Sequence, residues 1–253
     1  MLPDVTVPFY SADYYARHDP FLAAALSDAT PQAAPKPGPV AVLNAATFRP
    51  DKPVAPGSLA TLFGDFPDVP STDATAIPLP RQLSGVEVLI DSVAAALIAV
   101  RPGQINFQVP PETAIGQAAV RVRRNGAEIA SGTVIVESSA PGIFVANSLD
   151  LARPGAILDE NSRLLTDASP ARRGSVIQIY ATGQGNTSDL TRVYIGAELA
   201  DVLFSGPQPS FPGLWQINAR VPDTAALSGQ APVFVVIGSN ASNAVTMKVG
   251  NAQ

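Results

Sequence analysis

The sequence contains no cysteine and only one histidine in 253 residues. The absence of cysteine excludes disulfide bonds and thiolate metal ligands. Catalysis of the Ser-His-Asp or Cys-His type needs a histidine held beside the nucleophile. His18 stands in an N-terminal arm, so we expect it at a surface or an interface. We therefore predict no catalytic, cofactor-binding or metal-binding residues, and a protein that is not an enzyme.

Motifs for nucleotide and metal binding are missing as well. The sequence has neither a Gly-x-Ser-x-Gly elbow nor a Gly-Lys-Ser/Thr phosphate loop. The Gly-Gln-Gly stretch at 183–185 lacks the third glycine of a dinucleotide loop and is predicted to be a turn at a strand end. Asp65, Asp68 and Asp73 lack the alternate spacing of a calcium loop and are typical of turns.

Charge and long apolar runs are also scarce. Charged residues make up 15% of the chain, and the net charge is −5. A nucleic-acid interface needs clustered Lys and Arg, so no such partner is expected. No apolar run approaches the ~18 residues of a membrane span. Residues 93–100 are instead typical of a buried strand. Pro3, Asp4 and Pro8 interrupt any signal peptide at the start, so we expect either a protein that is not exported or one whose leader is not present.

A duplicated phrase is the strongest positive feature of the sequence. Residues 102–113 and 212–224 each carry Gln-Ile-Asn, then Val-Pro, then an acidic residue followed by Thr. Each phrase leads through a glycine into an alternating apolar stretch. Such a repeat predicts two copies of one β-domain.

Strands are predicted wherever apolar and polar residues alternate between turn signals. The 25 prolines and 19 glycines indicate short strands with stiff turns. The predicted fold class is all-β, with two tandem immunoglobulin-like (IPT/TIG-like) β-sandwiches and an extended N-terminal arm. The predicted segments are an aromatic arm with a Pro-rich linker at 1–40, a first sandwich at 41–139, a connection with a small hairpin at 140–169 and a second sandwich at 170–253.

The N-terminal arm is predicted to bind a partner. Residues 4–10 alternate in a way that suits an added strand, and the Pro-rich stretch at 30–39 suits an extended linker. Docking on its own first sandwich and insertion into a neighbouring molecule both stay open at this point. The predicted partner-binding residues are Val5, Val7, Phe9, Tyr10, Tyr14, Tyr15 and Phe21.

Two repeated asparagines are predicted to be structural locks. Asn106 and Asn218 each stand between apolar neighbours in the duplicated phrase. A buried amide must be hydrogen-bonded, and the usual partner is main chain in an adjacent loop. The single tryptophan, Trp215, is interpreted as a core or edge residue, with a sugar or subunit contact as the alternative.

Six phrases give the chain a family resemblance. They are Val-Leu-Asn-Ala-Ala-Thr-Phe at 42–48, Val-Ala-Pro-Gly-Ser at 54–58, Pro-Gly-Gln-Ile-Asn-Phe-Gln-Val-Pro at 102–110, Ala-Pro-Gly-Ile-Phe at 140–144, Ile-Tyr-Ala-Thr-Gly-Gln-Gly at 179–185 and Gly-Leu-Trp-Gln-Ile-Asn at 213–218. In order over about residues 41–250, they resemble the Solibacter-type uncharacterised C-terminal domain family of secreted acidobacterial proteins. The resemblance implies an exported pair of β-sandwiches and carries no catalytic residues.

These observations favour a non-catalytic extracellular structural or interaction protein. We expect a subunit of a bacterial cell-surface assembly or filament, joined through the N-terminal arm by self-association or within a larger complex. The alternative is a carbohydrate- or surface-binding accessory module of a secreted protein. The expected partner is protein, carbohydrate is possible, and nucleic acid, cofactors and a membrane span are not expected.

Overall fold

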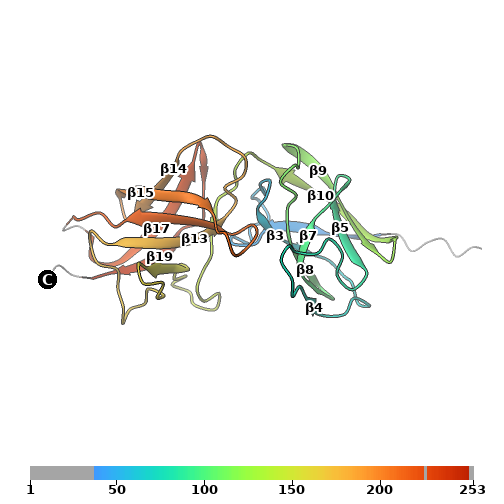
Figure 1. Cartoon of the computed structure of the whole chain (residues 1–253), viewed down its shortest axis with the longest axis horizontal. Helices are drawn as coiled ribbons and strands as arrows, with labels where there is room; N and C mark the ends of the chain where they lie inside the picture. Colours follow the sequence, from blue (N-terminus) through green and yellow to red (C-terminus); the bar gives the residue numbers. More distant parts are fainter. Residues whose placement is uncertain (1–36, 225–226, 251–253) are drawn as a thin grey trace, which may run out of the picture. The chain divides into compact units, whose positions relative to one another are not determined.

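The computed structural model describes residues 37–224 and 227–250, shown in colour in Figure 1. They belong to one compact unit, Pro37–Gln253. Within these residues the secondary structure consists of strands and turns without a helix, which confirms the predicted all-β class. The part of the chain that the structure describes therefore contains no helix that could cross a membrane. The predicted partner-binding residues and His18 lie outside the described residues.

The first set of strands forms two sheets (Figure 1). One sheet has the order β2-β3-β8-β7-β4, and the other has the order β1-β10-β9-β5-β6. Their bounds are β1 (Gly38–Pro39), β2 (Ala41–Asn44), β3 (Leu59–Phe63), β4 (Thr72–Asp73), β5 (Val86–Ile90), β6 (Val93–Ala94), β7 (Ala96–Arg101), β8 (Gln104–Gln108), β9 (Gly116–Arg124) and β10 (Ala127–Val136).

The second set of strands repeats this order. Its pairing path is β11-β13-β16-β15-β14-β17-β18, with β12 beside β13 and β19 beside β17. The bounds are β11 (Gly142–Ile143), β12 (Ile157–Asp159), β13 (Val176–Thr182), β14 (Thr191–Ile195), β15 (Glu198–Pro207), β16 (Trp215–Arg220), β17 (Gly229–Ile237), β18 (Asn240–Ala241) and β19 (Val245–Val249).

The strand order in both sets is that of an immunoglobulin-like fold. In such a fold the strands ABED form one sheet and CFG the other. The path β2-β3-β8-β7 corresponds to ABED, and β5-β9-β10 corresponds to CFG. In the second set, β11-β13-β16-β15 and β14-β17-β19 take the same places. The immunoglobulin-like fold class is thus confirmed, while the domain boundaries at 40, 139 and 169 stay a prediction.

Each set of strands has its own cluster of buried apolar side chains. One cluster lies within residues 42–136 and the other within residues 143–249. Alternation along the strands builds both clusters, because every second side chain points to the same face. Fully buried members include Leu62, Ile90, Leu97, Ile105 and Phe107 in the first set, and Ile177, Ile179, Ile195, Ile217 and Ile237 in the second.

A β-bulge occurs at the same place in both sets. The pairing of β7 with β8 shifts between Leu97 and Ala99, so Ile98 is the extra residue opposite Asn106. The pairing of β15 with β16 shifts in the same way and leaves Leu203 as the extra residue. A bulge increases the local twist and bends its strand. The duplication therefore extends to irregular backbone features.

Local turn chemistry explains the tightest hairpin. Asn125 and Gly126 join β9 to β10 with φ values of 50° and 86°. Two positive φ angles define the two-residue turn that matches the twist of the flanking strands, and Asn-Gly is the sequence that favours it. The sequence signal and the observed turn therefore agree.

The structure corrects the sequence-based boundaries in two places. The strand expected at 93–100 is broken at Ala95 into β6 and β7, because these residues leave one sheet and enter the other. Asp65, Asp68 and Asp73, which are typical of turns by sequence, lie in a segment that contains β4, and β4 pairs with β7. A two-residue strand lined by polar residues gives no periodic signal, so its sequence is typical of a loop.

Candidate functional site

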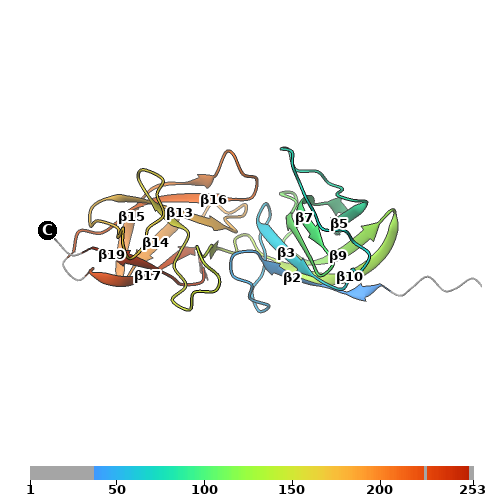
Figure 2. The ribbon, with the colours of Figure 1, turned by 90° about the horizontal axis from the view of Figure 1, so that it is seen from below.

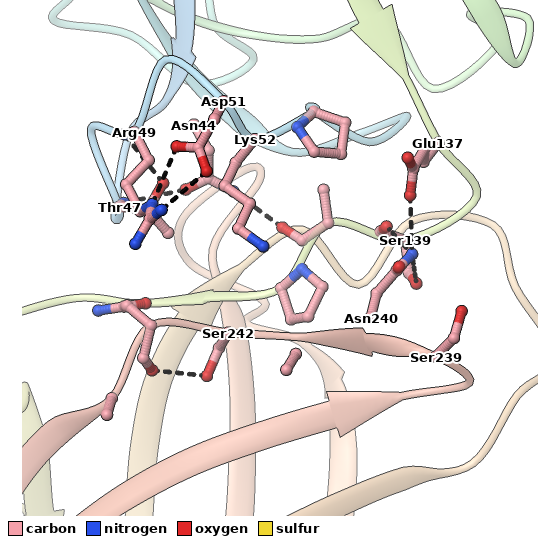
Figure 3. Close-up of a pocket in the computed structure, with 16 residues that line it drawn as sticks. Asn44, Thr47, Arg49, Asp51, Lys52, Glu137, Ser139, Ser239, Asn240 and Ser242 are labelled. Atoms are coloured by element: carbon pink, nitrogen blue, oxygen red, sulfur yellow. Dashed lines mark hydrogen bonds and ion pairs between the residues drawn. The ribbon is translucent and has the colours of Figure 1, made fainter.

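A polar hollow of about 500 Å³ lies beside the connection between the two sets of strands (Figure 3). Three segments line it: residues 44–53 after β2, residues 137–141 of the connection, and residues 239–244 around β18. Its lining consists of polar, charged, alanine and proline side chains, without an aromatic ring. The residues labelled in Figure 3 are Asn44, Thr47, Arg49, Asp51, Lys52, Glu137, Ser139, Ser239, Asn240 and Ser242.

Asn44 is the buried centre of one wall of the hollow. Its side chain is 1% exposed. The Nδ2 atom donates to the carbonyl oxygen of Ala140 at 2.8 Å, and the Oδ1 atom accepts from the main-chain nitrogens of Ala46 at 2.9 Å and Thr47 at 3.2 Å. One amide thus closes the turn after β2 and fixes the connection. Sequence reasoning singled out Asn106 and Asn218 and missed this lock.

Two asparagines hold the connection from the opposite wall. Asn240 donates from Nδ2 to the carbonyl oxygen of Ser139 at 2.7 Å and to a carboxylate oxygen of Glu137 at 3.0 Å. Asn243 forms a reciprocal pair with Ile143, accepting from its main-chain nitrogen at 2.9 Å and donating to its carbonyl oxygen at 3.0 Å. The amide donors of this wall are therefore bonded to the protein's own backbone and to Glu137.

Gly183 and Gly185 allow the connection to lie against the end of β13. The main-chain nitrogen of Ala140 donates to the Gly183 carbonyl at 2.8 Å, and that of Asn186 donates to the Ser138 carbonyl at 3.1 Å. Both glycines have positive φ, and a Cβ on either would overlap with a carbonyl of the connection. The predicted strand-end turn at 183–185 is present, and its glycines serve a close approach of two backbones.

Thr182 joins the two sets of strands through its hydroxyl group. The main-chain nitrogen of Leu59, at the start of β3, donates to the Thr182 Oγ1 atom at 2.7 Å. The same hydroxyl donates to the Gly213 carbonyl at 2.9 Å, and Thr182 is fully buried. A side chain of the second set therefore satisfies a backbone group of the first.

Replacing Thr182 with valine is expected to lower the free energy of unfolding by about 2–3 kcal/mol. Valine has nearly the same shape but leaves the Leu59 nitrogen and the Gly213 carbonyl without the hydroxyl partner, and each unsatisfied buried group costs ~1–3 kcal/mol. Urea denaturation measures the change. The Thr182→Ser variant keeps the hydroxyl and should lose less than half as much. Equal losses in the two variants would contradict the hydrogen-bond explanation.

The charges around the hollow are balanced in sign. Arg49 donates to Asp51 in an exposed ion pair at 2.7 Å, and this hydrogen bond is the main reason that the pKa of Asp51 lies below its ordinary value. Lys52 and Glu137 add one charge of each sign to the lining. A site with mixed charges has no net field that would attract a strongly charged ligand.

A second hollow of about 760 Å³ lies beside β12 and β13. Two of its carboxylates are paired locally: Asp159 with Arg163 at 2.7 Å, and Asp223 with Arg173 at 3.9 Å. The pKa of Asp159 lies below its ordinary value, chiefly because the Arg163 main-chain nitrogen donates to it. This carboxylate therefore stabilises a turn in the small hairpin of the connection.

The repeated asparagines occupy equivalent places but are only half-buried. The Oδ1 atom of Asn106 accepts from Gln104 at 2.8 Å, and that of Asn218 accepts from Gln216 at 2.9 Å. Each asparagine thus accepts from a glutamine two residues earlier on the same strand, and Asn106 also accepts from the Thr61 hydroxyl at 3.1 Å, where main chain of an adjacent loop was expected. Positions i and i+2 share a face of a strand, which explains the contact. Their role as locks of the repeat stays a prediction.

The other residues that the sequence singled out lie at separate places in the structure. Trp215 is 2% exposed and donates from Nε1 to the Ser205 hydroxyl at 3.0 Å, so the core interpretation is confirmed. Asp73 forms an ion pair with Arg101 at 2.6 Å. Within residues 37–224 and 227–250, no group of three His, Cys, Asp or Glu residues is arranged to hold a metal ion.

Comparisons with known proteins add distant likenesses of fold. No protein-family model and no curated protein matches the chain, so the resemblance to the Solibacter-type family stays a prediction. A Bacteroides ovatus structure, SGBP-B of a mixed-linkage glucan utilization locus with a bound heptasaccharide, is 15% identical with a TM-score of 0.35 and covers 79% of this chain and 44% of its own. The chain thus spans less than half the length of that protein.

Two further solved structures match the chain with comparably low sequence identity and TM-score. The titin immunoglobulin tandem A164–A165 is 9% identical, with a TM-score of 0.25, and covers 80% of this chain and 95% of its own. The plexin A4 extracellular region is 10% identical, with a TM-score of 0.28, and covers 85% of this chain and 16% of its own. No function follows from likenesses at this level.

Proposed function

We propose that the chain is a non-catalytic structural and interaction protein of the bacterial cell exterior, a subunit of an assembly joined through its N-terminal arm. One observation carries the proposal: buried polar side chains at the junction hold backbone of the protein itself. The buried Asn44 and Thr182 both bond main-chain groups, and the half-buried Asn243 does so as well. A catalytic centre instead directs such groups toward a substrate.

The hydrogen bonds at the junction between the two sets of strands also favour a rigid unit. Buried hydrogen bonds that are fully satisfied make a polar network rigid and specific. The connection is held by Asn44 from one side, by Asn240 and Asn243 from the other, and by the backbone of Gly183. A rigid building block of this kind suits a repeated subunit better than an enzyme that must open and close.

Deleting residues 1–36 is expected to convert an assembled protein into a monomer. This deletion keeps β1, whose residues Gly38 and Pro39 pair with β10, so the fold should be retained. Light scattering coupled to size-exclusion chromatography measures the mass of the intact and shortened chains at equal concentration. Thermal unfolding of both chains is the control for the fold. Monomers in both samples over a micromolar to millimolar range would refute the proposed assembly.

Carbohydrate binding at the hollow is the second candidate function. The observation in its favour is the concentration of hydroxyl, amide and charged groups in a space of about 500 Å³, which is within the range of small-ligand sites. The missing aromatic ring weighs against it, since sugar faces commonly stack on aromatics. Titration with soluble oligosaccharides tests carbohydrate binding, with chemical-shift changes at Ser239–Ala244 as the readout. Asp51→Asn is the matched site variant.

A further inference from the structure

One long edge of β15 is uncovered in the second set of strands. Residues 198–200 of β15 pair with β14, and residues 201–207 pair with β16. Among the residues that the structure describes, no strand pairs with the other edge of residues 201–207. The equivalent strand of the first set, β7, has β8 on one edge and β4 on the other. The two copies therefore differ at this edge.

The first set covers its own edge with the segment between β3 and β5. The main-chain nitrogen of Ala74, just after β4, donates to the carbonyl oxygen of the bulge residue Ile98 at 2.8 Å. The nitrogen of Leu97 donates in turn to the Pro80 carbonyl at 2.7 Å. Both groups point away from β8 and would be unpaired without this segment. The segment of residues 64–85, which contains the short strand β4, therefore covers this edge of β7.

Within residues 37–224 and 227–250, the second set has no such cover. Its corresponding segment, residues 183–190, is much shorter and runs against the connection through Gly183 and Asn186. Leu203 is the counterpart of Ile98, and Phe204 is the counterpart of Ala99, because Phe204 pairs with Asn218 as Ala99 pairs with Asn106.

Side chains at equivalent positions are more exposed on the β15 edge than on the β7 edge. Ala99 is 7% exposed, whereas Phe204 is 44% exposed, and Leu203 is 52% exposed where Ile98 is half-buried. The hydroxyls of Thr191 and Ser205 lie 2.9 Å apart, which brings the exposed Leu190 near the same edge. An edge with unpaired backbone groups and apolar side chains is a template for another strand.

We propose that residues 4–10 of a second copy add to this edge as a strand. The inference rests on the proposed assembly and names its acceptor site. Val5, Val7 and Phe9 alternate, so one face of the added strand would be apolar and would cover Leu203 and Phe204. Pro8 donates no hydrogen bond, and proline is tolerated in a strand at a sheet edge.

The donor is assigned to a second copy, because the arm is joined to the first set of strands and the acceptor strand belongs to the second. The described chain begins at β1, beside β10 in the first set, whereas the acceptor strand β15 belongs to the second set, as Figures 1 and 2 show. A contact between the N-terminal arm of one copy and the β15 edge of another uses two different surfaces and is therefore head-to-tail. Such a contact repeats from subunit to subunit and produces a ring or an open filament.

Lysine substitutions at the acceptor edge test the proposal. Lysine on an edge strand blocks the addition of another strand. Leu203→Lys and Phe204→Lys in the intact chain are each expected to weaken self-association by about tenfold or more, equivalent to ~1.4 kcal/mol, in sedimentation-velocity experiments. Ile135→Lys is the matched control, because Ile135 is also 52% exposed but lies on β10. This control should assemble like the unmodified protein.

The outcomes separate this inference from the proposed function. If deleting residues 1–36 abolishes assembly and the two β15 variants assemble normally, the proposed acceptor site is wrong. The proposed role of the arm in assembly then still holds. If the deletion changes nothing, the proposed function fails first. Weakening by the control variant to the same degree would also overturn the acceptor site.

Disulfide trapping gives a second measurement that does not depend on a destabilising charge. The chain has no cysteine, so Val7→Cys and Leu203→Cys introduce single thiols. Mixing the two variants under oxidising conditions should give a dimer whose peptides link positions 7 and 203. Thr6→Cys, on the opposite face, and Leu151→Cys, 98% exposed at another site, should link far less. A link formed only within one chain carrying both substitutions would overturn the assignment to a second copy.

Discussion

Replacing Gly183 with alanine is expected to lower the free energy of unfolding by about 3–4 kcal/mol. The φ angle of 87° costs a residue with a side chain ~1–2 kcal/mol. The added Cβ would also overlap with the Ala140 carbonyl, and such overpacking costs ~1–3 kcal/mol. Because both obstacles are backbone atoms, no rotation of a side chain relieves them. Urea denaturation of both proteins measures the difference.

Gly174→Ala is the matched control for this prediction. Gly174 has a φ angle of 75°, and a Cβ there would have no heavy atom within 4 Å. It therefore carries the conformational cost alone, ~1–2 kcal/mol. A loss at Gly183 no larger than that at Gly174 would show that the connection moves aside without cost.

Replacing Asn44 with alanine is expected to destabilise the fold by about 3 kcal/mol. The change removes three hydrogen bonds and leaves the Ala140 carbonyl and the nitrogens of Ala46 and Thr47 without the amide. Each buried group left unpaired costs ~1–3 kcal/mol, and water that enters the adjacent hollow recovers part of this cost. Chemical denaturation gives the total loss.

Asn147→Ala is the control for the asparagine prediction. Asn147 is exposed and accepts a local hydrogen bond from the main-chain nitrogen of Leu149 at 3.0 Å. Its removal should cost less than ~1 kcal/mol, because water replaces the exposed bond. Similar losses at the two asparagines would mean that Asn44 is not the lock that its burial indicates.

Local periodicity predicted most of the fold. Runs rich in apolar residues between turn signals indicate strands, and residues 59–63, 86–90 and 245–249, which form β3, β5 and β19, are such runs. Val202 and Leu97 occupy equivalent places in the two copies of the repeat, and so do Phe204 and Ala99, as the pairing of both strands shows. Periodicity and a duplicated phrase are both patterns in the order of residues, so a single sequence is enough to detect them.

The junction could not be predicted in the same way. Asn44 bonds Ala140 over a separation of 96 residues, and Asn243 bonds Ile143 over a separation of 100. A single sequence carries no signal for pairs this distant. A weaker signal was present for Asn106, since Gln104 stands two residues earlier and strands place such residues on one face.

The bond between Leu59 and Thr182 has a consequence for synthesis on the ribosome. Chains are made from the N-terminus at roughly 5–20 residues per second, and domains begin to fold as they emerge. The Leu59 nitrogen must wait for a hydroxyl that is 123 residues further along the chain. That wait is roughly 6–25 seconds at the same rates. The start of β3 therefore receives this hydrogen bond only after translation has reached Thr182, in the second set of strands.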